Sequence, residues 1–97
     1  MKPRITINSS STGELEIWLN DAGRNLLVKE LQNLSEQSDH FHLSPEYLDG
    51  EVPVQVTPYR DDDKIIEWGK VLFRPDHWDA KYFPHVLAGD ADRGDSS

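Results

Sequence analysis

The sequence predicts an α+β fold, a two-layer domain with one amphipathic helix on one face of a four- to five-stranded, mainly antiparallel sheet. Several short segments alternate between apolar and polar side chains, as half-buried strands do. One segment repeats its apolar residues at helical spacing. Strands are expected both before and after this helix, which favours an antiparallel or mixed sheet over a series of strands joined by helices.

The first three elements are expected in the order strand, strand, helix. Residues 4–8 and 14–20 alternate as strands, and the Ser/Thr/Gly segment between them is typical of a turn. Asp21 is a candidate N-cap for a helix over about residues 21–37, whose apolar stripe is Leu27, Val28, Leu31 and Leu34. Gly23 is expected to weaken its first turn slightly.

Two short strands are expected after the helix. Phe41 and Leu43 alternate with two histidines, and Pro45 ends this strand because it lacks a backbone donor and restricts the residue before it. Valines alternate over residues 52–56, where Pro53 favours the edge or the start of a strand.

A longer strand is expected at residues 64–74, in which Gly69 suggests a bulge or a close approach of two backbones. The pattern dissolves from Pro75 onward, although aromatic side chains there could still dock on the domain. We therefore expect one domain over residues 1–88 and a flexible acidic tail over residues 89–97.

Composition limits the class of protein. The chain has 97 residues and no cysteine, which excludes disulfide scaffolds, cysteine zinc sites and cysteine nucleophiles, and which suits a reducing compartment such as the cytoplasm. The polar start of the chain and the absence of a run of about 18 apolar residues predict neither a signal peptide nor a membrane span.

The charge points to a protein partner. Eighteen acidic side chains against ten basic ones give a formal charge of −8. Such a chain repels the phosphates of nucleic acids and attracts a basic protein, so direct nucleic-acid binding is disfavoured.

The open face of the predicted sheet is the expected binding surface. If Leu15, Ile17 and Leu19 lie under the helix, the opposite phase of the strands carries Glu14, Glu16, Trp18, His40, His42, Gln55 and Thr57. Tryptophan is enriched at protein interfaces, and Trp18 is therefore the most informative member of this group. The predicted partner-binding residues are Glu14, Glu16, Trp18, His40, His42, Asp61, Asp62, Asp63 and Trp68.

Catalytic and metal sites were weighed against this interpretation. His40 and His42 point the same way on a strand and could begin a zinc site, but a catalytic zinc needs a third protein ligand. The aspartates at 61–63 could share a proton, yet such runs are more often solvated turn residues. We predict no metal, no cofactor and no catalytic group, and two outward-facing histidines whose contacts with a partner vary near pH 6 to 7.

The first half of the chain resembles the bacterial immunity protein 32 family of polymorphic toxin and contact-dependent inhibition systems. The resemblance covers about residues 13–57. It is carried by the segments Leu15-Glu16-Ile17 and Asn20-Asp21-Ala22-Gly23, the helix leucines Leu27, Leu31 and Leu34, and the run His40-Phe41-His42-Leu43-Ser44-Pro45 with Leu48.

This resemblance implies a cytosolic, non-catalytic inhibitor that binds one cognate toxin domain, often a nuclease, and blocks or distorts its active site. The acidic surface agrees, because it could compete with phosphate for a basic cleft. The alternative is a general protein-interaction or adaptor module with an open sheet face. The oligomeric state stays open.

Overall fold

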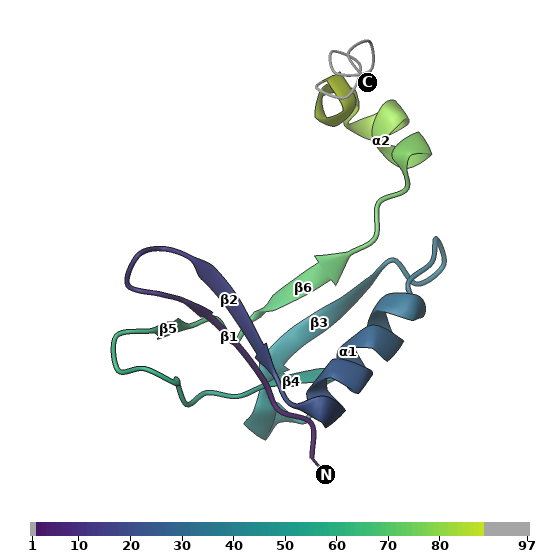
Figure 1. Cartoon of the computed structure of the whole chain (residues 1–97). Coiled ribbons are helices and arrows are strands. Elements are labelled where there is room, and N and C mark those ends of the chain that lie inside the picture. The colour runs from purple at the N-terminus through teal and green to yellow at the C-terminus, as the bar shows by residue number, and fades with distance from the viewer. Residues whose placement is uncertain (1, 89–97) are drawn as a thin grey trace.

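The computed structural model describes residues 2–88 and has an α+β architecture, as predicted (Figure 1). The elements in chain order are β1 (Ile5–Ser9), β2 (Leu15–Leu19), α1 (Asp21–Gln32), β3 (His40–Pro45), the 3-10 helix η1 (Glu46–Leu48), β4 (Val52–Val54), β5 (Lys64–Ile65), β6 (Gly69–Leu72) and α2 (Asp76–Tyr82). None of the helices within these residues is long and apolar enough to cross a membrane.

The strands form two small sheets where one larger sheet was expected. One has the order β2-β1-β5 and the other the order β4-β3-β6, in the part of the chain that is described. Backbone hydrogen bonds still connect β1 to the segment after β4, where the amide of Gln55 donates to the carbonyl of Ile5 at 2.7 Å. The expectation of a single sheet is therefore wrong in detail, although the strands before and after α1 are in contact.

Two strand predictions need correction. The run at residues 64–74 is divided between the sheets, because β5 pairs with β1 while β6 pairs with β3. The residues between β5 and β6 cross from one sheet to the other, and alternation alone does not reveal such a crossing. In addition, β3 and β4 are parallel, joined by the short connection through η1.

Helix α1 begins at Asp21, as expected, but its N-cap is Asn20 rather than Asp21, and it ends earlier than expected. Asn20 is its N-cap, and its side-chain oxygen accepts hydrogen bonds from the amides of Gly23 at 2.7 Å and Arg4 at 2.9 Å. Gly23 serves a packing purpose as well, because a Cβ atom there would lie 2.3 Å from the carbonyl oxygen of Arg4. The helix ends at Gln32 rather than near residue 37.

The core lies between α1 and the strands β1, β3 and β4. Its buried apolar side chains are Ile5, Ile7, Phe41, Val52 and Val54, and half-buried side chains packed against them are Leu26, Leu27, Leu34, Leu43 and Val71. Phe41 and Leu43 thus face the helix as predicted. Because α1 packs over this group, it leaves the outer strand β2 uncovered.

The burial of the two faces of β2 is the reverse of the expectation, although Ile17 and Leu19 pair with the buried Ile7 and Ile5 and so share their face. Leu15, Ile17 and Leu19 were expected under the helix, but they are 62%, 52% and 40% exposed. Glu16 and Trp18 are half-buried instead, because the segment leading to β5 folds over their face. A strand at the edge of a sheet can expose either of its faces, so its sequence alternation does not say which face is covered.

Helix α2 extends away from the two sheets (Figure 1). The radius of gyration is 16.5 Å, whereas a compact chain of this length has about 12.5 Å. Glu36 Oε1 lies 2.5 Å from His77 Nε2, so the segment after α1 contacts the start of α2 through two exposed side chains. The predicted tail at residues 89–97 lies outside the described residues.

Candidate functional site

A hollow beside Trp68 is the candidate site. It has a volume of about 330 Å³ and is lined by His42, Leu43, Ser44, Trp68, Gly69 and Lys70. The antiparallel pairing of β3 with β6 places His42 opposite Lys70 and Leu43 opposite Gly69. Trp68, immediately before β6, is 61% exposed. An exposed indole, an imidazole and a lysine ammonium group thus line the same hollow.

Gly69 lies in the lining of the hollow, opposite Leu43. A Cβ atom at this position would lie 3.6 Å from the Cδ1 atom of Leu43, an ordinary contact distance. Neither a bulge nor a close backbone approach therefore requires this glycine.

His40 and His42 form one continuous surface with the hollow. Their rings lie edge to face with centroids 5.0 Å apart, which confirms that both point the same way. His42 Nδ1 lies 3.4 Å from Glu51 Oε1, and His40 Nδ1 lies 2.8 Å from Asp39 Oδ1. Hydrogen bonding to His40 lowers the pKa of the Asp39 carboxyl group. Both histidines thus lie next to a carboxylate on an exposed strand.

A second cluster gathers three other predicted residues around Arg60. The Nε–H group of Arg60 donates to both carboxylate oxygens of Asp63, at 3.2 and 3.0 Å, and its Nη2 group donates to Glu16. The side chain of Asp63 is only 1% exposed. Hydrogen bonding to Asp63 raises the pKa of Arg60, so the guanidinium stays charged. Two of the predicted acidic contact residues are therefore neutralised within the chain.

Trp18 belongs to this second cluster. Its ring stacks on Tyr59 with centroids 4.2 Å apart and planes 10° from parallel, and Arg60 lies 5.4 Å from its centroid. The indole N–H donates to Asn8 Oδ1 at 2.7 Å, and Asn8 Nδ2 donates to Glu16 Oε1 at 3.1 Å. Trp18 is thus held inside a polar and aromatic cluster, and its predicted place on an open face is wrong.

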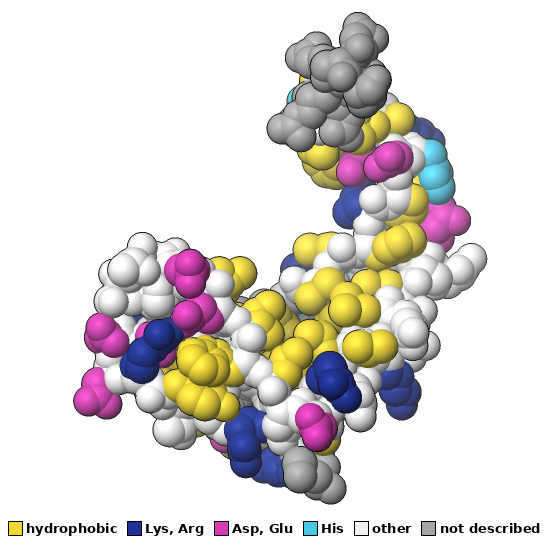
Figure 2. Space-filling model, in the orientation of Figure 1, with side chains coloured by type: hydrophobic (Ala, Val, Ile, Leu, Met, Phe, Trp, Pro, Cys, Tyr) yellow, Lys and Arg dark blue, Asp and Glu magenta, His cyan; other side chains and the backbone are white. Residues whose placement is uncertain are grey.

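The remaining predicted residues stay apart from both groups. Glu14 is exposed immediately before β2, in the turn of the β1–β2 hairpin. Asp61 and Asp62 are exposed in the turn before β5. In the view of Figure 2, hydrophobic side chains gather across the middle of the molecule, and most acidic side chains lie toward the hairpin end and toward α2. The predicted partner-binding residues therefore do not form one surface. His40, His42 and Trp68 lie at or beside the hollow, whereas the exposed acidic residues Glu14, Asp61 and Asp62 lie apart from it.

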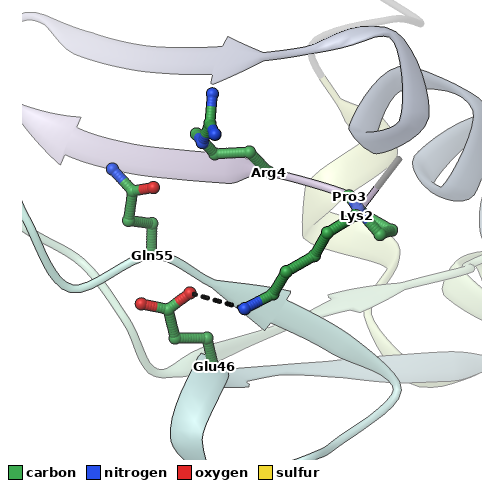
Figure 3. Close-up of a pocket in the computed structure, with 5 residues that line it drawn as sticks. All are labelled: Lys2, Pro3, Arg4, Glu46 and Gln55. Carbon is green, nitrogen blue, oxygen red and sulfur yellow. Dashed lines mark ion pairs between the residues drawn. The ribbon is translucent and has the colours of Figure 1, made fainter.

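A smaller hollow of about 150 Å³ lies near the start of the chain (Figure 3). It is lined by Lys2, Pro3, Arg4, Glu46 and Gln55. The Lys2 side chain reaches toward Glu46, with Nζ and Oε2 3.8 Å apart, but Lys2 is 80% exposed. Exposed ion pairs of this kind contribute little to stability or specificity, so this hollow is the weaker candidate.

Within residues 2–88, no three side chains among His, Asp and Glu gather as a group that could hold a metal ion. Sequence reasoning missed Asn8, Tyr59, Arg60 and Lys70. Asn8 gave a faint signal, because it stands in the polar phase of a strand. Arg60 stands next to the aspartate run that it neutralises, but only the fold brings Glu16 to it.

Comparisons of the chain with protein-family models, with curated proteins and with solved structures found no match. The fold and the hollow therefore carry the functional argument, together with the motif resemblance described above.

Proposed function

We propose that the chain is an immunity protein that binds a cognate bacterial toxin domain, a nuclease, in the cytoplasm and neutralises it without catalysis. The resemblance of residues 13–57 to the immunity protein 32 family supports this proposal, as does the formal charge of −8. An acidic chain approaches a basic nuclease rapidly, because long-range attraction steers the encounter.

The observation that carries the proposal is the exposed indole of Trp68 beside a hollow of about 330 Å³. Binding energy at protein interfaces is concentrated in a few residues, often Trp, Tyr or Arg, that become fully buried next to a pocket. An apolar or aromatic side chain of the toxin would enter the hollow and cover Trp68. His40 and His42 would then lie at the rim of the contact.

The acidic groups act at longer range in this proposal. Glu51 and Asp39 flank the histidines, while Glu14, Asp61 and Asp62 are exposed elsewhere on the surface. These carboxylates attract the toxin, and Trp68 holds it after the encounter. The cluster around Arg60 stabilises the fold and does not contact the partner; it contains Glu16, Trp18 and Asp63.

Co-expression in bacteria tests this function. The toxin domain encoded by the neighbouring gene is expressed with wild-type chain, with Trp68→Ala or with Tyr47→Ala. Tyr47 is a matched control, because it is also aromatic and 68% exposed but does not line the hollow. Wild type and Tyr47→Ala should restore growth, whereas Trp68→Ala should restore it only when it is overexpressed.

An adaptor module is the second candidate, favoured by the same exposed hollow, since any protein with a suitable apolar side chain could occupy it. The gene neighbourhood separates the two functions. A toxin gene beside this one supports the immunity function. A wild-type chain that fails to protect against that toxin would favour the adaptor.

A further inference from the structure

Strand β2 has a free edge as well as an exposed apolar face. Among residues 2–88, this strand of the sheet β2-β1-β5 pairs with β1 only. Leu15, Ile17 and Leu19 are 62%, 52% and 40% exposed, although three aliphatic side chains in one short strand would normally be buried. Proteins usually protect such an edge with charged side chains, a proline or a bulge; β2 has no proline and no bulge, and its one charged residue is Glu16.

The hydrogen-bond pattern shows which backbone groups point outward. On the hairpin, Ser10 donates to Glu14 and Asn20 donates to Arg4, so the even-numbered residues of β2 face β1. The carbonyl groups of Ile5 and Ile7 bond instead to Gln55 and Ile66, on the side of β1 away from β2. Backbone groups alternate along a strand, so the N–H and C=O groups of Leu15, Ile17 and Leu19 face the open edge.

We propose that β2 pairs with β2 of a second copy of this chain in an antiparallel, two-fold symmetric contact centred on Ile17. In this register Ile17 faces Ile17 of the second copy, and Leu15 faces Leu19 of the second copy. The outward backbone groups of these residues complete the ladder. Two three-stranded sheets then form one continuous sheet across the dimer.

The register centred on Ile17 places no like charges opposite each other. Glu16 lies opposite Trp18 of the second copy, and Glu14 lies opposite Asn20, so no carboxylate faces another. A shift that centres the axis on Glu16 would bring two glutamates together, which is unfavourable. Arg60 already neutralises Glu16 within each chain. The strand is therefore a nearly uncharged strip on a chain of charge −8.

The size of the contact predicts a weak dimer. A single strand edge buries less than the roughly 1,200–2,000 Å² of a stable interface, so dimers should appear only at high protein concentration. Two chains of charge −8 also repel each other. Salt screens this repulsion, since the Debye length falls from about 30 Å at 0.01 M to about 10 Å at 0.1 M. Dimerisation should therefore strengthen with salt, whereas binding to a basic toxin should weaken.

Cysteine cross-linking of the full chain tests the register. The chain has no cysteine, so a single substitution gives an unambiguous product. Residues in a hydrogen-bonded antiparallel pair have Cα atoms about 5.5 Å apart, within the range that a disulfide spans. Ile17→Cys should oxidise rapidly to a covalent dimer. Leu72→Cys, equally exposed on strand β6, should cross-link at least ten-fold more slowly.

Sedimentation of the unmodified chain, from about 10 µM to 1 mM, supplies the second readout. Wild type should dimerise more tightly at 0.5 M than at 0.02 M salt, and Ile17→Lys should stay monomeric while Leu72→Lys still dimerises. Three results would overturn the proposal: a monomer at every concentration, equal cross-linking at both positions, or a dimer that Ile17→Lys does not weaken. The last result would be expected if two copies dimerised by exchanging α2. Toxin protection by Ile17→Lys should be unchanged, which keeps this result separate from the proposed function.

Discussion

Asn8 is the structural centre of the second cluster, and its removal should be the most damaging polar substitution in the protein. Its side chain is fully buried, accepts from the indole of Trp18 at 2.7 Å and donates to Glu16 at 3.1 Å. A buried Asn whose amide oxygen and nitrogen both form hydrogen bonds can be stabilising. Without Asn8 the indole N–H of Trp18 loses its acceptor, while Glu16 keeps its contact with Arg60.

The magnitude for Asn8→Ala follows from these contacts. The neutral bond to the indole contributes about 1 kcal/mol and the bond to the carboxylate about 1.5 kcal/mol. The small cavity left by the amide adds roughly 0.5 kcal/mol. We expect a loss of about 3 kcal/mol in the free energy of unfolding, and a melting temperature lower by about 15 °C for a chain of this size.

Urea unfolding followed by tryptophan fluorescence measures this loss. Asn25→Ala is the matched control, because Asn25 is exposed on α1 and should change stability by less than about 0.5 kcal/mol. A double-mutant cycle with Trp18→Phe should give a coupling energy of about 1 kcal/mol. Equal stabilities of Asn8→Ala and Asn25→Ala, or zero coupling, would refute this description of the cluster.

Three further substitutions test other parts of the structure. Gly23→Ala should destabilise the protein by about 2 kcal/mol in the same urea assay, because its methyl group would strike the carbonyl of Arg4; a neutral result would contradict the close packing of α1 on β1. Thr6→Val should instead stabilise by about 1 kcal/mol, because the fully buried Thr6 hydroxyl has no hydrogen-bond partner within residues 2–88; a loss of stability would show that it has one. Because the pKa of Asp39 is lowered, its contact with His40 stabilises the fold above the ordinary carboxyl pKa, and this stabilisation is lost as the pH falls through the pKa of Asp39 in the folded protein. In His40→Gln, NMR titration should show the pKa of Asp39 returning to its ordinary range. An unchanged pKa would exclude His40 as the cause.

Sequence patterning predicted the strands around α1 well because their local signals agree with their burial. Phe41 is buried while His40 and His42 are exposed, as strict alternation requires. The same alternation in β2 misled the prediction. Ile17 and Trp18 lie on opposite faces of β2, and the sequence does not show which face is covered. A distant segment covers the face of Trp18, because it places Tyr59 over the indole. No local pattern contains that information.

The candidate site was predictable only in part, for a similar reason. His42 and Trp68 were both expected at a partner-binding surface, and the pairing of β3 with β6 brings them to one hollow. Asp63 looked like a solvated turn residue, yet Arg60 allows its carboxylate to be buried. Whether a charge is free or already paired depends on contacts between segments far apart in sequence.

The affinity of the chain for the toxin domain encoded beside it is the most direct test of the proposed function. Isothermal titration calorimetry at about 0.15 M salt should show one-to-one binding that Trp68→Ala weakens at least 30-fold, equivalent to about 2 kcal/mol, while Tyr47→Ala leaves it unchanged. Equal affinities for wild type and Trp68→Ala would contradict the role of the hollow, and no binding by the wild type would contradict the immunity function itself.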